Sequence, residues 1–415
     1  MSPSPRAALL LALAAIAALV VPVAVAAVAF AAVLGATTAD ALAARRVERA
    51  ARRAPARLAR GVPAEMTVEV DAPRARAVVV GQAVPPGIEV APAEGAAPLQ
   101  AVVVARRRGR HVLPAPGVRV DGPLGLGRWF HRVGDDAEVL VYPDLPAARR
   151  LATAVRQGRL GDAARRTRGP LGLGTDFESI RDYVPDDDVR LVNWRATVRT
   201  GRPMSNQYRV DRDREVLCVV DGGRLMAAPV GDRTRLDAAL DAVVAVAAVA
   251  DTLGDRCGAL VVSSSVTRNV APRRGGARAV VDAVFDVEPD PVDTDYELAF
   301  RTAERVKRAL VVVFTDVVDE AAARGLVEAV PILARRHHVV VASVRDDDLE
   351  DAARAASGDR LAECAAVVAR DVLDARRRAL GEVRRAGAEL VEASADALAT
   401  MCVGAYLRAK ARARA

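Results

Sequence analysis

The hydrophobic positions along the chain follow three patterns, one after another. Residues 7–39 carry no charged side chain, short apolar runs broken by Pro and Gly fill residues 61–145, and from residue 215 strand-like runs alternate with helical periodicity. These patterns predict a membrane segment, a β-sandwich-like module and an α/β domain with a mainly parallel sheet, in that order.

The uncharged segment 7–39 is longer than the roughly 20 residues of one helical span and shorter than the roughly 40 needed for two. It is also too long for the core of a signal peptide, which has about 7–15 residues. Pro22 lies in its middle, where a helical hairpin can turn. Seven arginines between residues 45 and 60 follow it, and the positive-inside rule places that side in the cytoplasm. Arg6, before the segment, weakly favours the cytoplasm for the other end as well. A helical hairpin places both ends on the cytoplasmic side, so a hairpin is favoured; a single span and a buried Ala-rich helix are the alternatives.

Residues 61–145 contain strand-like runs at Thr67–Val70, Ala77–Val80, Ala101–Ala105 and Glu138–Tyr142. Their short spacing is typical of a sandwich. Residues 146–214 are interpreted as a connector whose basic, Ala-rich first part is a short helix or a mobile link. The hexapeptide GPLGLG occurs at residues 122–127 and 169–174. No Gly-Lys-Ser/Thr follows either copy, so both are interpreted as turns rather than phosphate loops.

Residues 215–415 alternate strands and helices, which predicts a mainly parallel sheet with helices on both faces. The predicted strands are Val216–Val220, Gly258–Val262, Ala309–Phe314, Val339–Ser343 and Ala388–Val391. The predicted helices are Leu236–Leu253, Val280–Phe285, Tyr296–Arg308, Ala321–Arg335, a long helix over residues 359–386 and a last one to the C-terminus.

Composition excludes several classes of function. The net charge of +7 is carried almost wholly by Arg, since Lys occurs only at positions 307 and 410, and 53 acidic residues nearly balance 60 basic ones. The excess is too small and too dispersed to indicate nucleic-acid binding. The four Cys and four His show no metal-binding spacing, so buried reduced thiols are expected.

The stretch 174–202, GTDFESIRDYVPDDDVRLVNWRATVRTGR, combines dense charge with Phe, Tyr and Trp in a chain that is only 3% aromatic. An acidic group is followed by regularly spaced arginines, whose forks bind carboxylates in a bidentate manner. Two interpretations stay open: an ion-paired structural strap, or a surface that docks a partner. The candidate partner-binding residues are Arg181, Asp187, Asp188, Arg190, Trp194, Arg195 and Arg199.

This stretch resembles the signature of a bacterial family, the domain of unknown function fifty-eight. The residues that match are Gly174, Phe177, Ile180, Arg181, Tyr183, Pro185, Asp187, Asp188, Arg190, Val192, Trp194, Ala196 and Arg199. The resemblance implies an N-terminal pair of membrane helices, a β module and a von Willebrand factor type A-like domain. It also implies a partnership with a MoxR-type AAA+ ATPase, in an adaptor held at the inner membrane with its globular part in the cytoplasm.

Two carboxylates, Asp221 and Asp316, follow strands of the predicted sheet. Ligands of open α/β sheets bind beyond the carboxyl ends of the strands, and oxygen ligands suit Mg²⁺. The arrangement resembles the metal-ion-dependent adhesion site of type A domains, with Thr294 matching the loop Thr. Gly223 and Leu225 stand where that motif has serines. The sequence therefore predicts a degenerate site, either binding Mg²⁺ weakly or serving as a metal-free protein-binding face.

Catalysis has little support in the sequence, because neither a nucleophile elbow nor a Walker A motif occurs. The leading hypothesis is a membrane-anchored interaction protein, with Mg²⁺ as the one candidate cofactor. The alternatives are an enzyme of hydrolytic chemistry at the Asp221/Asp316 face and a purely structural membrane scaffold.

Overall fold

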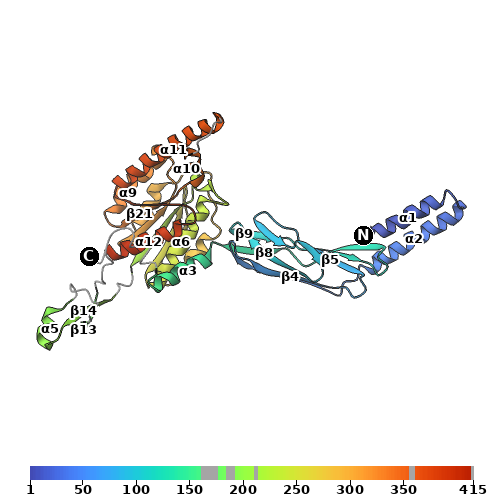
Figure 1. Cartoon of the computed structure of the whole chain (residues 1–415), viewed down its shortest axis with the longest axis horizontal. Helices are drawn as coiled ribbons and strands as arrows, with labels where there is room; N and C mark the ends of the chain where they lie inside the picture. The colour runs from blue at the N-terminus through green and yellow to red at the C-terminus, as the bar shows by residue number, and fades with distance from the viewer. Residues whose placement is uncertain (160–175, 184–191, 210–213, 355–359, 413–415) are drawn as a thin grey trace. The chain divides into compact units, whose positions relative to one another are not determined.

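The computed structural model describes residues 1–159, 176–183, 192–209, 214–354 and 360–412 (Figure 1). The chain divides into two compact units, Met1–Tyr142 and Pro143–Ala415. The first unit joins a helical hairpin to β-sheets, and the second contains a six-stranded sheet with helices. The second GPLGLG copy, at residues 169–174, lies outside the described residues.

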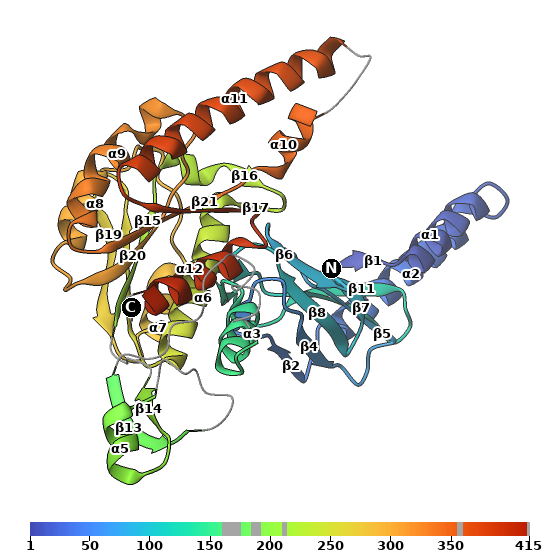
Figure 2. The same cartoon turned by 60° about the vertical axis from the view of Figure 1, so that its left-hand side comes forward.

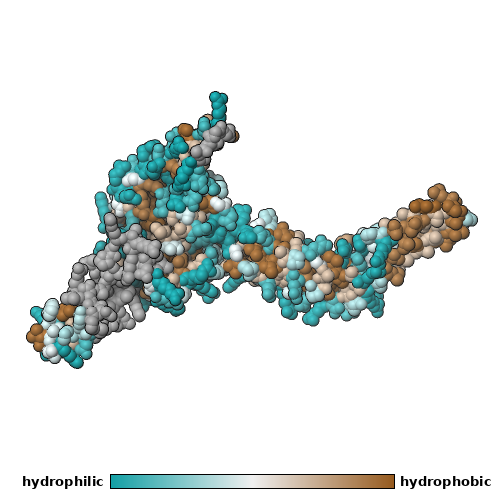
Figure 3. All heavy atoms as spheres, in the orientation of Figure 1, coloured by the Kyte–Doolittle hydropathy of each residue, from teal (hydrophilic) through white to brown (hydrophobic). Residues whose placement is uncertain are grey.

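The N-terminal segment forms two helices, α1 (Pro5–Ala17) and α2 (Val23–Ala43), with Pro22 as the N-cap of α2. At 1.5 Å per residue, the 21 residues of α2 extend about 31 Å, close to the roughly 30 Å hydrocarbon core of a bilayer. Within the described residues, α2 is the one helix long and apolar enough to cross a membrane. Hydrophobic side chains cover the outside of both helices (Figure 3).

The first GPLGLG segment, residues 122–127, is a turn, and it holds both ends of the hairpin. The carboxylate of Asp40, near the end of α2, accepts hydrogen bonds from the amides of Leu124, Leu126 and Gly127 at 2.7, 2.7 and 2.9 Å. At the other end, the Ser4 hydroxyl donates to the Gly125 carbonyl at 2.6 Å. A Cβ on Gly127 would lie 2.3 Å from the backbone of α2, so this approach requires glycine.

Three sheets make up the rest of the first unit. Their strand orders are β1-β11-β10-β5-β7, β2-β4-β8-β6 and β3-β12-β9. The strands are β1 (Ser2–Pro3), β2 (Arg49–Arg53), β3 (Arg57–Ala59), β4 (Ala64–Asp71), β5 (Ala77–Gly81), β6 (Ile88–Ala91), β7 (Glu94–Ala96), β8 (Leu99–Ala105), β9 (Gly109–Leu113), β10 (Gly117–Asp121), β11 (Gly127–Arg132) and β12 (Ala137–Tyr142).

The middle sheet of this unit, β2-β4-β8-β6, shares a core with each of the other two. Met66 and Val103 from it pack with residues of β9 and β12, and Val68 and Leu99 pack with residues of β5 and β10. Strands β1, β2 and β3 precede residue 61, so the β-structure begins earlier in the chain than the sequence pattern indicates.

The second unit is built on a sheet of order β19-β18-β15-β20-β21-β22. Five strands are parallel, and the edge strand β19 runs antiparallel to β18. The strands are β15 (Glu215–Asp221), β18 (Arg256–Val262), β19 (Val266–Arg273), β20 (Ala309–Phe314), β21 (His338–Val344) and β22 (Glu389–Ala393). A two-stranded pair, β16 (Pro229–Val230) and β17 (Arg233–Thr234), lies before α6.

Helices cover both faces of this sheet (Figure 2). Successive residues of β15 alternate between the two layers, which is why the whole strand is apolar and buried: Val216 and Cys218 face one layer, and Leu217 and Val219 face the other. The first layer contains α3 (Leu145–Arg156), α6 (Arg235–Thr252), α7 (Ala277–Val284) and α12 (Leu398–Arg412), and the second contains α8 (Tyr296–Ala303), α9 (Glu320–Ala334) and α11 (Arg360–Arg385).

The five strands and six helices predicted for this unit all form, with boundaries shifted by a few residues. Sequence periodicity missed β19, whose side chains are largely exposed, and α10 (Asp347–Arg354), which is short and acidic. The expected short helix after residue 146 is α3, and it packs against α6 rather than forming a free link.

Candidate functional site

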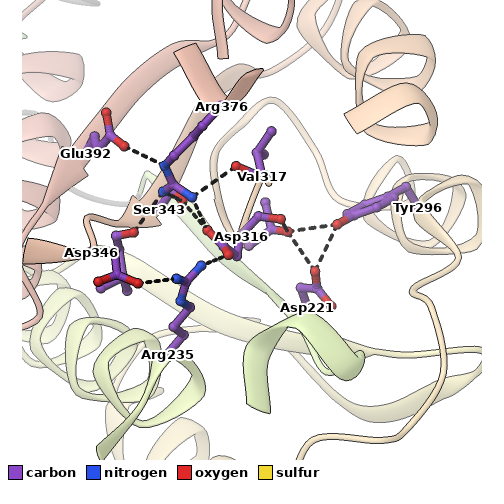
Figure 4. Close-up of polar contacts among 11 residues, drawn as sticks. Asp221, Arg235, Tyr296, Asp316, Val317, Ser343, Asp346, Arg376 and Glu392 are labelled. Carbon is purple, nitrogen blue, oxygen red and sulfur yellow. Dashed lines mark hydrogen bonds and ion pairs between the residues drawn. The ribbon is translucent and has the colours of Figure 1, made fainter. Parts of the chain in front are cut away.

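Asp221 and Asp316 lie at the carboxyl edge of the sheet, as the strand pattern predicts. Asp221 is the last residue of β15, and Asp316 follows the neighbouring parallel strand β20 by two residues. Both residues are buried, with exposures of 4% and 3%. Each carboxylate belongs to its own network of side chains (Figure 4).

The Asp221 carboxylate is enclosed by hydroxyl groups. Thr294 donates to Oδ1 through a short contact, while Tyr296 and Thr315 donate to Oδ2 at 2.9 and 2.7 Å. The amide of Gly223 also donates to Oδ1, at 2.8 Å. Burial, and then the charge of Asp221, raise the pKa of the Tyr296 phenol well above its usual value, so this hydroxyl stays a donor at neutral pH. The structure therefore brings Asp221 and Thr294 together, and both oxygens of the Asp221 carboxylate accept hydrogen bonds from neighbouring protein groups.

Gly223 occupies the place of a serine in the resembled adhesion-site motif, and the structure explains why it is glycine. A Cβ there would lie 2.5 Å from the Thr294 hydroxyl oxygen and 2.8 Å from the Val292 carbonyl oxygen. Any larger residue would push the loop that carries Thr294 away from Asp221. Arg224 does not pair with Asp221; its Nε donates to Asp293 at 2.7 Å.

Asp316 is held by two buried arginines instead of hydroxyl groups. Arg376 Nη1 donates to Oδ1 at 2.5 Å, and Arg235 Nη1 forms a short ion pair with Oδ2. Ser343 donates to Oδ1 at 3.2 Å. Burial, and then the neighbouring Arg376 charge, lower the pKa of Arg235, although the guanidinium still gains from its pair with Asp346.

These contacts decide whether the candidate residues suit Mg²⁺. A hard cation needs several oxygen ligands with uncompensated negative charge. Asp316 already faces two guanidinium groups, and the Asp221 oxygens already accept four hydrogen bonds. Among the described residues, no group of three His, Cys, Asp or Glu side chains could hold a metal ion. As placed, hydroxyl and amide donors engage the Asp221 carboxylate and two guanidinium groups engage that of Asp316, so Mg²⁺ would have to displace these partners.

The sequence analysis did not identify Arg235 and Arg376 as partners of Asp316, although the position of each in its helix indicates a buried or compensated charge. Arg376 lies on α11 in register with the buried residues Ala369, Leu380 and Val383, so it occupies a core-facing position of the helix. Arg235 is the first residue of α6, where the helix dipole disfavours a cation unless a carboxylate compensates it.

The signature stretch forms a small two-stranded unit with a helix. β13 (Asp176–Asp182) pairs antiparallel with β14 (Met204–Arg209), and α5 (Trp194–Thr200) lies between them in sequence. The candidate residues Asp187, Asp188 and Arg190 lie outside the described residues. Arg181 belongs to β13, and its side chain is not described.

The helix α5 is well capped and tied to β14. Asn193 accepts a hydrogen bond from the Ala196 amide at 3.0 Å, and the Thr197 hydroxyl accepts one from the Met204 amide at 3.0 Å. Trp194 nevertheless has 68% of its surface exposed, and Val198, one turn later, has 84%. Arg195 and Arg199 on the same helix are exposed as well. The signature thus presents two apolar side chains at i and i+4, with arginines beside them.

Comparison with known proteins identifies the family. A model described as "Protein of unknown function DUF58" matches residues 179–389, about half of the chain. The chain belongs to the DUF58 family. The match covers α5, Asp221 and Asp316 with their hydroxyl and arginine partners, and most of the six-stranded sheet of this DUF58 protein.

Its relatives include proteins of unknown role. The uncharacterized proteins Rv1480 of Mycobacterium tuberculosis and Mb1516 of Mycobacterium bovis are each 29% identical over 190 residues, 43% of this DUF58 chain. The match spans 59% of the length of these relatives.

Among solved structures, proximal thread matrix protein 1 from the mussel byssus is similar over 49% of this chain and 47% of its own, at 12% identity and a TM-score of 0.29. An uncharacterized membrane spanning protein from Vibrio fischeri is similar over 48% of this chain and 99% of its own, at 13% identity and a TM-score of 0.18. At these scores neither likeness carries a structural argument.

Proposed function

We propose that this DUF58 protein is a membrane-anchored adaptor that binds a MoxR-type AAA+ ATPase through α5. The observation that carries the proposal is the exposure of Trp194 and Val198 on a helix whose ends are capped. A large aromatic side chain costs free energy when it stays in water, and exposed Trp is enriched among the residues that dominate protein interfaces.

The chemistry of α5 specifies the partner surface. An apolar pocket would receive Trp194, and acidic side chains around it would pair with Arg195 and Arg199. Arginine forks recognise carboxylates in a bidentate manner, so these pairs would fix the orientation of the complex. The closed networks around Asp221 and Asp316 favour a binding role over hydrolysis, because neither carboxylate is free to act as a base.

We also propose a fold family for each unit and a cellular location for the protein. The positions of Asp221, Thr294 and Asp316 at one sheet edge support a type A-like domain, and the shared cores of the first unit support a β-sandwich. The arginines that follow α2 support a bacterial cell-membrane protein with its globular part in the cytoplasm.

The test uses the full-length protein in non-ionic detergent and a purified MoxR-type ATPase, with the dissociation constant measured by surface plasmon resonance. Trp194→Ala should weaken binding by tenfold or more, about the free energy carried by an interface hot spot. Val368→Ala on α11, which removes another exposed apolar side chain (61% exposed), is the matched control. Equal affinity of the two variants, or no binding by the unmodified protein, would contradict the proposal.

The two alternatives predict other results. If the protein is an enzyme, Asp316→Asn should abolish turnover of an ester or phosphate substrate without affecting ATPase binding. If it is only a scaffold, neither ATPase binding nor turnover should be detectable.

A further inference from the structure

A pocket of about 490 Å³ opens at the amino-terminal edge of the six-stranded sheet, opposite the edge that carries Asp221 and Asp316. The starts of β15 and β20, the link from α9 to β21, and the end of α12 line it. It therefore belongs to a different part of the second unit from the networks described above. Its volume lies within the range of small-molecule sites.

Positive charge dominates the lining. Six Arg or Lys side chains contribute to it against a single carboxylate, Glu215. Two further carboxylates lie next to the pocket: Asp255 pairs with Lys410 at 2.5 Å, and Glu389 pairs with Arg412 at 3.2 Å. Glu304 also lies close enough to act on the charge of His337, and the excess of cations over carboxylates remains two after all three are included.

Three of the lining arginines, Arg308, Arg335 and Arg336, are exposed and have no carboxylate partner among the described residues. They come from two adjacent segments, since β20 and β21 are neighbouring parallel strands. Their guanidinium groups can turn toward one ligand without breaking an existing ion pair.

The lining residue His337 has a hydrogen-bond donor that is buried rather than open to the pocket. His337 is 5% exposed, and its Nδ1 accepts a hydrogen bond from the Ala309 amide at 3.2 Å. The ring hydrogen must therefore sit on Nε2, which is buried and has no hydrogen-bond partner among the described residues. Burial and the nearby Arg336 charge lower the pKa of His337, which keeps the ring neutral. Because Nε2 has almost no exposed surface, a ligand in the pocket does not reach it, and the exposed arginines are the candidate ligand contacts.

We propose that this pocket binds a small phosphate-bearing anion, with Arg308 and Arg336 pairing with phosphate oxygens. Planar guanidinium forks match phosphate oxygens in a bidentate manner. Of the rings in the lining, that of Tyr406 is 1% exposed and offers no face on which a base could stack, and the exposed imidazole of His338 is already bound to Glu389. The site thus recognises the phosphate groups themselves, as in pyrophosphate or a phospholipid headgroup.

The experiment titrates pyrophosphate into the full-length protein in non-ionic detergent by isothermal calorimetry at low salt. A second arm uses micelles containing phosphatidylglycerol at the same phosphate concentration. Binding in the first arm identifies a soluble phosphate compound as the ligand type, and binding in the second alone identifies a lipid headgroup.

Two variants test the assigned contacts. Arg308→Gln and Arg336→Gln each remove one charge, and each should weaken binding about tenfold. Arg324→Gln on α9, an exposed arginine outside the pocket, should bind as the unmodified protein does. Thermal unfolding of each variant verifies that it is folded.

Specific loss in the two pocket variants would support the proposal in either arm. The absence of binding in both arms would overturn it, and so would an equal loss with Arg324→Gln, which would indicate general attraction of anions. Binding of a hexaglutamate peptide without binding of pyrophosphate would also overturn it, because the pocket would then select carboxylates of a protein.

Discussion

Removing the guanidinium of Arg376 should strongly destabilise the six-stranded sheet. This side chain is 7% exposed and lies at the centre of the network that holds Asp316 (Figure 4). It donates to Asp316, Ser343, Glu392 and the backbone carbonyls of Val317 and Val344, at distances between 2.5 and 3.0 Å. Arg376→Met keeps an apolar side chain of similar length and deletes all five contacts.

The expected loss of stability in Arg376→Met follows from the buried polar groups that lose their partner. Breaking a buried ion pair by removing one partner costs about 3–5 kcal/mol, because the remaining charge stays desolvated. Arg235 still compensates part of the Asp316 charge, but two buried carbonyls lose their donors. We therefore expect the free energy of opening to fall by about 3–5 kcal/mol, or about two to three and a half orders of magnitude in the opening equilibrium.

Hydrogen exchange followed by mass spectrometry measures this opening locally, which suits a chain of two units. Peptides covering β20 and β21 should exchange faster by that factor in Arg376→Met. Arg378→Ala is the control from the same helix: its side chain is 62% exposed, it pairs with Glu320, and it should change stability by about 1 kcal/mol or less. Equal exchange in the two variants would refute the assigned role of Arg376.

Three further predictions follow from other contacts. Millimolar Mg²⁺ should leave the thermal unfolding temperature unchanged, because two arginines already neutralise Asp316; a Mg²⁺-dependent increase that disappears in Asp316→Asn would contradict this. Asp40→Ala should make the amides of the 122–127 turn exchange at least tenfold faster, whereas Thr38→Ala, which removes a hydrogen bond within α2, should not. A hydrogen bond from His338, together with nearby arginines, lowers the pKa of Glu389 from 4.5 to about 2. The stability that the Glu389 carboxylate contributes is therefore present above pH 4.5 and is lost as the pH falls toward 2. Unfolding measurements at several pH values should show the stability difference between the unmodified protein and Glu389→Gln shrinking across that interval.

The sequence by itself determined the order of the parts and most of the secondary structure. Charge-free residues before Asp40 indicate the hairpin helices, and continuous apolar runs such as 216–220 indicate strands buried on both faces. These predictions depend on local periodicity, which every fold of this class must satisfy. The exposed edge strand β19 escaped detection because an exposed strand lacks an apolar pattern.

The tertiary structure decided what the polar residues do. Asp221 and Asp316 reach one edge of the sheet, as their positions after strands predict, yet one is enclosed by hydroxyl groups and the other by Arg235 and Arg376. These arginines lie 81 residues before and 60 residues after Asp316 in the chain, so no local pattern could pair them with it. Whether a buried carboxylate binds a metal, a base or an arginine depends on which distant side chains folding brings within hydrogen-bond distance.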